Sequence, residues 1–524
     1  MIPVIDVFAG PGGLSEGFCA FTAASSHRPF DVRLSIEKDV HAHSTLKLRS
    51  FYRAFHPAAV PEAYYEVLRG KLPVSGLYEL YPREAEVADR VAWFAELGVN
   101  GVAQSEVRAR ISKALSGSEI WVLIGGPPCQ AYSIAGRSRN RGRAGYVFEK
   151  DEKTQLYLEY LQILADHRPA VFVMENVKGL LSATLKDQQL FVRMLEDLEH
   201  PARALQRERR NVENGESIHD RYKVFSLVKG NLFGATENLN DFVIRAENYG
   251  VPQCRHRVIL LGIREDLGQI VPGKLVGQNE IAASNVIGDM PALRSGLSGS
   301  SDSFDRWAEC LRQAMAQRWF KGARKKAGEK VQDRIRQVVE SLVCPVRGRG
   351  AEFLKCTAKP KYASEWYVDS RLDGLCNFTA RTHMPADLHR YLYAACFAKE
   401  HVRAPRLADF PPDLLPKHDN VPTALERGGY FSDRFRVQLE NAPATTVTSH
   451  IAKDGHYYIH PDPRQCRSLT VREAARLQKF ADNYFFSGPR TKQYIQVGNA
   501  VPPLLAKQIA AIVYGVLYRA GCRG

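Results

Sequence analysis

Short apolar runs alternate with helix-forming segments through the first half of this 524-residue chain. Each run is bounded by turn residues and is too short to be a helix, which is typical of buried strands in a parallel sheet. Alternating strands and helices predict a doubly wound α/β domain, in which ligands bind where the carboxyl ends of the strands meet. The predicted strands are Val4–Phe8, Val32–Ile36, Ile120–Ile124, Ala170–Met174, Tyr222–Val228 and Val258–Ile263.

A glycine-rich turn, Phe8-Ala9-Gly10-Pro11-Gly12-Gly13-Leu14, follows the first predicted strand. Such a turn lets a ligand approach the backbone closely. Glu37 follows the second strand, where an acidic side chain can bind ribose hydroxyls. The turn lacks the G-x-G-x-x-G spacing, and Pro11 removes a backbone donor that a pyrophosphate could use. A cofactor with a nucleoside and no phosphates fits better, which points to S-adenosylmethionine.

The segment Gly125-Gly126-Pro127-Pro128-Cys129 comes directly after the strand 120–124. A cysteine behind a Pro-Pro turn is most often a buried packing residue. Here, however, it stands at the carboxyl end of a strand, where ligands are expected. The residues after it favour a basic loop that closes over a phosphate backbone, with arginines at Arg137, Arg139, Arg141 and Arg143.

Two further segments place charged residues at the same edge of the predicted sheet. Glu175 follows the strand 170–174, where its carboxylate could also be a helix N-cap. Arg255 and Arg257 lead into the strand at Val258 and could be surface charges. Because they stand between a proline turn and an apolar strand, we expect them to face the cleft.

Composition bounds the class of protein. The formal net charge is +15 and the sequence pI is about 9.3, which favours a polyanionic partner without requiring one. The ten cysteines are scattered singly and fall in no metal-ligand spacing, so we expect reduced thiols and no zinc site. We also expect no membrane span, no leader and a cytoplasmic location.

In this order, the segments resemble the motifs of the cytosine-5 DNA methyltransferase family, of the bacterial restriction-modification type. Near the end of the chain, Arg472–Gln478 resembles the penultimate motif of the family and Gln496–Pro503 its last. The resemblance covers roughly Met1–Arg264 and Ala442–Tyr518. It implies an α/β fold, a Rossmann-like S-adenosylmethionine-dependent methyltransferase domain with a smaller target-recognition domain inserted before the C-terminal motifs.

The implied organisation has three parts. Residues 1–266 are the first part of the catalytic and cofactor-binding domain, and 267–441 are the target-recognition domain. Residues 442–524 carry the C-terminal motifs, with a last helix that returns to the catalytic domain. The implied cofactor-binding residues are Phe8, Ala9, Gly10, Gly12, Gly13, Leu14, Glu37, Lys38, Pro127, Asn499 and Val501.

The resemblance also implies a chemistry. Cys129 attacks carbon 6 of a flipped-out cytosine, and carbon 5 then takes the methyl group. Glu175 holds the exocyclic amine and ring nitrogen 3, Arg257 binds the ring carbonyl, and Arg255 supports the cleft. The implied partner is double-stranded DNA, with a cognate restriction endonuclease that forms no stable complex, and we expect a monomer without membrane contact.

Three alternatives remain at this point: an RNA cytosine-5 methyltransferase, a catalytically inactive DNA-binding relative, and a nicotinamide-dependent oxidoreductase. The last leaves the Pro-Pro-Cys segment unexplained. Between Asp39 and Glu119 the chain is long, and the acidic residue with which the family contacts adenine cannot be placed. The stretch Tyr52–Ala103 therefore has no assigned role, and the basic stretch Arg318–Arg349 is expected to supply phosphate contacts.

Overall fold

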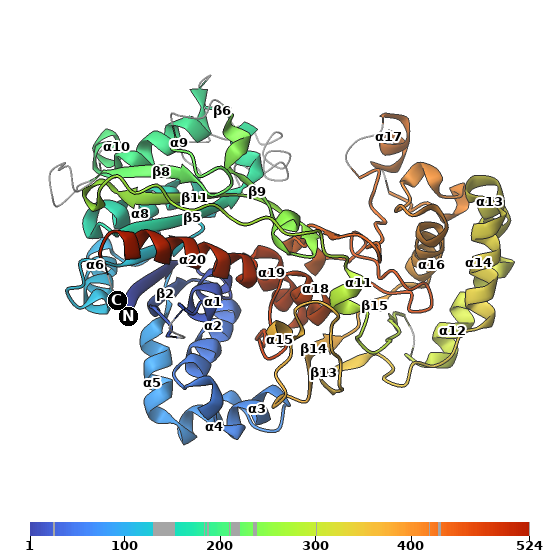
Figure 1. Ribbon diagram of the computed structural model, residues 1–524. Helices are drawn as coiled ribbons and strands as arrows, with labels where there is room; N and C mark the ends of the chain where they lie inside the picture. Colours follow the sequence, from blue (N-terminus) through green and yellow to red (C-terminus); the bar gives the residue numbers. More distant parts are fainter. Residues whose placement is uncertain are drawn as a thin grey trace.

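The computed structural model of the protein describes residues 1–24, 27–128, 152–182, 184–185, 188–208, 210, 221–233, 238–299, 301–418, 420–427 and 431–522. These residues form two lobes (Figure 1). The larger lobe, on the left of Figure 1, is built on a sheet, and the smaller lobe is mostly helical. Helices α18 (Val471–Leu477) and α19 (Arg490–Asn499) lie between the two lobes.

Eight strands of the described chain form the sheet of the larger lobe. Seven follow the order β3-β2-β1-β4-β5-β11-β8, and β9 pairs with β11. The strands from β3 to β5 on this path are parallel, whereas β11 is antiparallel to both β5 and β8. The strands are β1 (Ile2–Val7), β2 (Phe30–Glu37), β3 (Ala92–Phe94), β4 (Val122–Gly125), β5 (Val171–Val177), β8 (Tyr222–Ser226), β9 (Val243–Arg245) and β11 (His256–Arg264).

Helices cover both faces of this sheet, because successive strand residues point to opposite sides. Ile5 and Phe172 pack with α6, α8, α9 and α10, while Val4 and Val173 pack with α1 and α20. This layered arrangement confirms the predicted α/β fold class. The helices are α1 (Gly13–Ala20), α6 (Gln104–Leu115), α8 (Glu152–His167), α9 (Leu190–Glu199), α10 (Pro201–Arg207) and α20 (Pro503–Arg519).

The six predicted strands are all present, with ends that differ by a few residues. β1 ends at Val7 because Phe8 adopts a left-handed backbone conformation, with φ at 57°. β5 continues past Met174 to Val177, so Glu175 lies inside a strand. The alternative that Glu175 is a helix N-cap is therefore wrong.

The unassigned stretch between Tyr52 and Ala103 forms a helical insert and the edge strand β3. In Figure 1 the insert extends below the sheet and lies beside the hairpin of β13 and β14. Tyr64 and Leu68 of the insert share an apolar core with Leu372 and Cys376 of the hairpin region. The elements of this junction are α2 (Val40–Arg53), α3 (Glu62–Leu68), α4 (Val74–Leu80), α5 (Pro82–Val91), β13 (Gly350–Lys355) and β14 (Gly374–Thr379).

The smaller lobe has a core of its own, to which Trp307, Ile335 and Tyr391 contribute fully buried rings and side chains. Ile459 and Cys466, which follow residue 441, belong to the same core. The lobe comprises α12 (Phe304–Arg312), α13 (Arg318–Ala327), α14 (Glu329–Glu340), α16 (Pro385–His401) and α17 (Asn420–Arg427), with α11 (Ser284–Ile287) and α15 (Ser364–Tyr367) towards the middle of the molecule.

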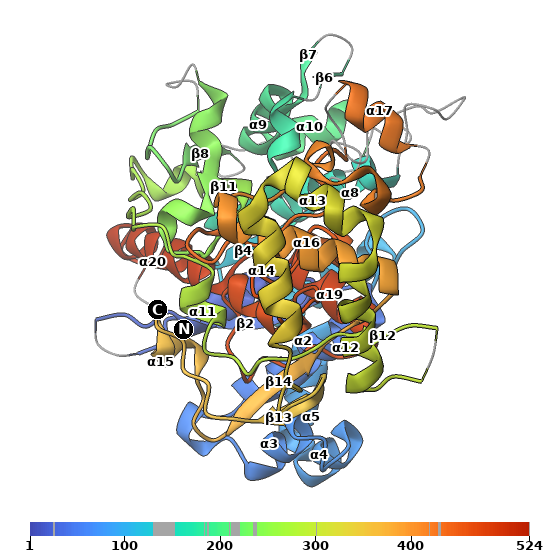
Figure 2. The same cartoon turned by 90° about the vertical axis from the view of Figure 1, so that its right-hand side faces the viewer.

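The basic stretch Arg318–Arg349 begins with α13 and α14, which lie at the outer edge of the smaller lobe in Figure 1. Figure 2 shows these two helices from outside, in front of the rest of the lobe. Exposed lysines on them, such as Lys325 and Lys330, therefore stand on helices remote from the sheet.

The C-terminal helix α20 returns to the larger lobe and packs along α1. By length and composition alone, the stretch Arg490–Arg519, which contains α19 and α20, could cross a membrane, and 61% of its apolar window is buried inside the structure. Gly17 permits the contact with α1, since a methyl group there would lie 2.4 Å from Cβ of Ala506.

Replacing Gly17 with alanine should push α1 and α20 apart, because the new methyl group would also lie 2.5 Å from backbone atoms of Pro503 and Lys507. Overpacking of this kind costs about 1–3 kcal/mol. We expect a lower midpoint of thermal unfolding in calorimetry. Gly515→Ala is the matched control on α20, where a methyl group would meet nothing within 4 Å and should stabilise the helix. Equal midpoints for the two variants would contradict this account of the packing.

Candidate active site

One edge of the sheet collects the predicted site residues. The carboxyl ends of β1, β2, β4 and β5 meet there, and the reversed strand β11 begins there. The register pairs Arg257 with Val177 and Ile259 with Glu175, so Arg257 and Glu175 are diagonal neighbours on one face. The antiparallel pairing thus brings the predicted arginine to the predicted glutamate.

Glu175 and Arg257 form an ion pair at this edge. Nε of Arg257 lies 2.8 Å from Oε1 of Glu175, and the two side chains are only 18% and 14% exposed. The other carboxylate oxygen faces the chain that leads to Cys129, since a methyl group on Gly126 would lie 3.0 Å from it. Cys129 lies outside the described residues, as do Arg137, Arg139, Arg141 and Arg143.

Arg255 occupies a different place from the one expected. Its side chain is 1% exposed, and its terminal nitrogens donate to the backbone carbonyls of Val447 at 2.8 Å and Gly498 at 3.2 Å. Burial, together with the neighbouring Arg257 charge, lowers the pKa of Arg255. We expected Arg255 to face the cleft beside Arg257. Instead, its side chain joins the start of β11 to two later segments and does not point at the reacting edge.

Two buried glutamines extend this junction, and sequence reasoning gave neither a role. Gln253 donates to the carbonyl of Leu477 and accepts from the backbone N–H of Val447. Gln478 donates to the carbonyls of Val497 and Ala500 at 2.9 and 2.8 Å. Amides that pair with backbone look like ordinary polar residues in a sequence. The backbone partners of Gln253 lie 224 and 194 positions away, and those of Gln478 lie 19 and 22 positions away.

The glycine-rich turn is held open beside Glu37. Gly10 adopts a left-handed conformation, and a side chain built there would meet nothing within 4 Å. Its backbone N–H donates to Oε2 of Glu37 at 2.8 Å, while Oε1 accepts from the N–H of Asp39 at 2.7 Å. Burial raises the pKa of Glu37. The Glu37 carboxylate is thus held in place at the end of β2, next to a glycine that has open space beside it.

The other predicted cofactor residues divide into two groups. Phe8, Ala9, Gly12 and Gly13 form the turn, and Gly13 touches the backbone of Val501, whose carbonyl would lie 2.2 Å from an added methyl group. Pro127 is buried at the end of β4. In contrast, the Leu14 side chain lies in the core, Lys38 forms an exposed ion pair with Glu96 at 2.7 Å, and Asn499 is exposed.

Glu96 is an acidic residue that sequence reasoning missed. It follows the edge strand β3, whose parallel pairing with β2 sets Phe94 beside Glu37. The strand has three residues, too few to show an apolar pattern, which explains why the acidic position could not be found from sequence. Its place beside Glu37 and Lys38 puts it at the same edge.

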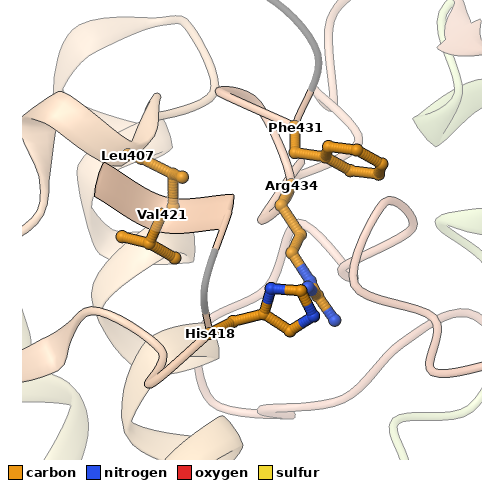
Figure 3. A pocket seen from close by; sticks show the side chains of 5 residues that line it. All are labelled: Leu407, His418, Val421, Phe431 and Arg434. Atoms are coloured by element: carbon orange, nitrogen blue, oxygen red, sulfur yellow. The ribbon is translucent and has the colours of Figure 1, made fainter. Parts of the chain in front are cut away.

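A separate hollow of about 120 Å³ lies in the smaller lobe (Figure 3). The apolar side chains of Leu407 and Val421 line it together with the His418 ring and the Arg434 guanidinium group. Phe431 is 49% exposed at its rim and has φ at 75°, a strained conformation for a residue other than glycine.

Comparison with known protein families identifies the family of this chain. The family described as C-5 cytosine-specific DNA methylase matches residues 98–201 and 238–514. The chain belongs to this family.

Relatives of the methyltransferase extend over nearly its whole length. The type II methyltransferase M.Bpa9945I of Bacillus paralicheniformis is 31% identical over 98% of this chain and 99% of its own. M.AgeI of Thalassovita gelatinovora is 24% identical over 97% of this chain and 98% of its own. M.ApeKI of Aeropyrum pernix, named a DNA (cytosine-5-)-methyltransferase, is 28% identical over 77% of this chain and 83% of its own.

The predicted family, activity and cofactor are thereby confirmed: the chain is a DNA (cytosine-5-)-methyltransferase that uses S-adenosylmethionine. The alternative of a nicotinamide-dependent oxidoreductase is excluded. The described residues fit the cofactor, since the space beside Gly10 is open and Glu37 offers carboxylate oxygens to ribose hydroxyls.

The two arginines of the methyltransferase should respond differently to substitution. Arg255→Met leaves two buried carbonyls without donors, at about 1–3 kcal/mol each, so the midpoint of thermal unfolding should fall clearly. Arg257→Met leaves the Glu175 carboxylate without its partner and should also lower the midpoint, but it should in addition lose about 10²- to 10³-fold in methyl transfer per folded enzyme, which Arg255→Met should retain. The reverse pattern would mean that the two roles are exchanged.

Glu37→Gln should weaken binding of S-adenosylmethionine about 10- to 100-fold, since a charge-assisted hydrogen bond contributes about 1.5–3 kcal/mol. Because burial raises the pKa of Glu37, wild-type affinity should also fall on acidification, as the carboxylate is protonated at a higher pH than an exposed one. Titration calorimetry at several pH values checks both effects. Glu79→Gln, at an exposed position, is the control. Wild-type affinity in Glu37→Gln would rule out the assigned contact.

Proposed function

We propose that Cys129 is the nucleophile of this methyltransferase and acts on a cytosine rotated out of duplex DNA onto the sheet edge. One observation carries the proposal: the backbone of Gly126, three residues before Cys129, runs against the Glu175 carboxylate that Arg257 holds. A base at this edge would meet a carboxylate, a guanidinium group and the start of the cysteine loop together. Flipping costs a few kcal/mol of unstacking and unpairing.

The thiolate is the form that attacks, and it adds to carbon 6 of the cytosine. A sulfur–carbon bond forms, and the ring electrons move towards carbon 5, which becomes enamine-like. Bound S-adenosylmethionine supplies an electrophilic methyl group. Transfer of this group to carbon 5 would release S-adenosylhomocysteine. A base, such as a water molecule, then takes the carbon 5 proton, the sulfur–carbon bond breaks, and Cys129 is regenerated with 5-methylcytosine.

Glu175 and Arg257 bind the cytosine edge in this proposal. A carboxyl group at Glu175 bonds ring nitrogen 3 and the exocyclic amine, which offsets the charge that develops on the ring during attack. Arg257 donates to the ring carbonyl and holds Glu175 in place through the 2.8 Å contact. The low exposure of the pair supports this role, because electrostatic interactions are stronger where water is excluded.

For the cofactor, we propose that Glu37 binds the ribose hydroxyls and that the turn Phe8–Gly13 and Val501 enclose the methionine end. Glu96 is our candidate for the acidic contact to adenine, with Lys38 as its partner on the rim of the pocket. Leu14 contributes through its backbone, since its side chain packs in the core. Pro127 and Asn499 remain proposed contacts through their positions beside β4 and Val501.

We propose that residues 267–441 carry target recognition, with 1–266 and 442–524 as the catalytic domain. The hollow of Figure 3 supports this, because it combines an arginine and a histidine with an apolar wall. Such groups read base edges and thymine methyl groups in the major groove. Arg434 also lies 3.4 Å from Asp454, which can hold its guanidinium group in place. Exposed lysines of α13 and α14, such as Lys325 and Lys330, are proposed to supply phosphate contacts at the outer edge of this lobe.

The proposed setting is restriction-modification or defence in the cytoplasm, which the type II names of the relatives support. A methyltransferase of this kind protects host sites and needs no stable complex with its endonuclease, so we propose a monomer that acts on duplex DNA. The net charge of +15 agrees with a polyanionic substrate.

Trapping tests the covalent step. Duplex DNA synthesised with 5-fluorocytosine in place of cytosine should form an adduct with the methyltransferase that survives denaturing electrophoresis, because fluorine cannot leave as the proton does. The adduct should require S-adenosylmethionine and be lost in Cys129→Ser, while calorimetric binding of the cofactor persists.

Transfer RNA with the same substitution is the control, together with labelled methyl transfer to unmodified duplex. Trapping of the RNA alone would support an RNA methyltransferase. A wild-type enzyme that binds DNA but transfers no methyl group would be an inactive relative, and an adduct in Cys129→Ser would overturn the assignment of the nucleophile.

A further inference from the structure

The segment 481–487 touches both the cofactor turn and the hairpin of β13 and β14. On one side, the hydroxyl of Tyr484 donates to the carbonyl of Pro11 in the glycine-rich turn. On the other, Phe486 exchanges two hydrogen bonds with the Asn377 side chain of β14, at 3.0 and 3.2 Å. The segment 481–487 therefore connects the glycine-rich cofactor turn to the hairpin of β13 and β14.

A chain of side chains runs through the same junction. Arg49 of α2 grips the carboxylate of Glu16 on α1 with two hydrogen bonds, at 2.5 and 3.0 Å. A third nitrogen of Arg49 donates to Oδ1 of Asn483 at 3.2 Å. The amide nitrogen of Asn483 then donates to Asp369 at 2.7 Å, next to the hairpin. Four side chains thus connect the helix after the cofactor turn to Asp369, in the loop between α15 and β14.

The helical insert adds a fifth member to this chain. The hydroxyl of Tyr65 donates to the same oxygen of Asp369 at 2.8 Å, while the other carboxylate oxygen accepts from the backbone N–H of Arg371 at 3.0 Å. Arg371 in turn donates to the carbonyl of Val60 in the insert. Asp369 is therefore held from three directions, one of which is the helical insert, a part of the chain without an assigned role.

Most of the side chains in this hydrogen-bonded network are buried. Glu16, Arg49 and Asn483 are 8%, 7% and 5% exposed. Although burial opposes ionisation, Arg49 and Arg53 lower the pKa of Glu16 to about 2, so the carboxylate is charged at neutral pH. A buried charge that loses its partner is costly, so the ion pair between Glu16 and Arg49 anchors one end of this network.

We propose that Arg49, Asn483 and Asp369 are positioning residues that keep the cofactor turn and the β13–β14 hairpin in one frame, so that cofactor and duplex DNA bind cooperatively. The inference rests on the proposed recognition role of residues 267–441. A displacement of the hairpin on DNA binding is transmitted to α1 through these residues and changes the affinity for the cofactor. By linkage, cofactor binding changes the affinity for DNA by the same factor.

The test measures the coupling factor, which is the ratio of the affinities for S-adenosylhomocysteine with and without DNA. Both affinities are measured by calorimetry. S-adenosylhomocysteine cannot react, and the DNA is a duplex that the wild-type enzyme has been shown to methylate. We expect DNA to tighten binding at least about fivefold, the lower end of ordinary couplings. In Tyr65→Phe and Asp369→Asn the factor should fall towards one. An amide at position 369 cannot accept on both sides, whereas Tyr65→Phe removes a single hydroxyl.

Tyr78→Phe is the matched control, since it removes a hydroxyl from the same insert at a ring that packs against Phe51 and Lys47 of α2. Its coupling factor should equal that of the wild type. A merely structural role for the chain would lower thermal stability or both affinities and leave the factor unchanged. That result, or a wild-type factor of one, would overturn the inference. If no duplex is methylated, the proposed function itself fails.

Discussion

Three charged side chains of α18 are almost completely buried, and the junction of the two lobes depends on them. Arg472 donates to the carbonyls of Cys376, Ala481 and Tyr484, and Arg476 pairs with Asp289 and Asp482. Although burial opposes it, Arg467 lowers the pKa of Glu473 to about 2. Because an unpaired buried charge is costly, these segments are held in a single arrangement. One residue after this helix, Gln478 carries the same constraint to the end of α19.

The reacting edge follows from that arrangement and from one reversed strand. Parallel strands alone bring the glycine-rich turn, Glu37, the Pro-Pro segment and Glu175 to one edge of a sheet. β11 adds Arg257 only because it runs the other way and so begins where β5 ends. Arg255, two residues earlier, then faces the C-terminal segments and ties them down. Two arginines of one motif thus have different roles: Arg257 lies at the reacting edge, and Arg255 holds the segments that surround it.

The distribution of charge in space differs from its distribution along the chain. The most basic stretch lies on α13 and α14, at the outer edge of the smaller lobe. The residues that line the hollow of the same lobe come from a less conspicuous segment, between Leu407 and Arg434. A long-range attraction to DNA follows from net charge wherever it lies, whereas recognition needs groups that reach base edges.

The sequence by itself determined the fold class, the six main strands, the family, the cofactor and the identity of Glu175 and Arg257 as neighbours at one edge. These follow from local apolar periodicity and from motifs whose chemistry is written in consecutive residues. It did not determine the place of Arg255, the role of Gln253 and Gln478, or the position of Glu96. Only the tertiary structure decided these, because each depends on partners or a neighbouring strand far away in the chain. The helical insert is the clearest case: nothing in residues 52–103 indicates that Tyr65 meets Asp369, some 300 positions later, and only packing brings them together.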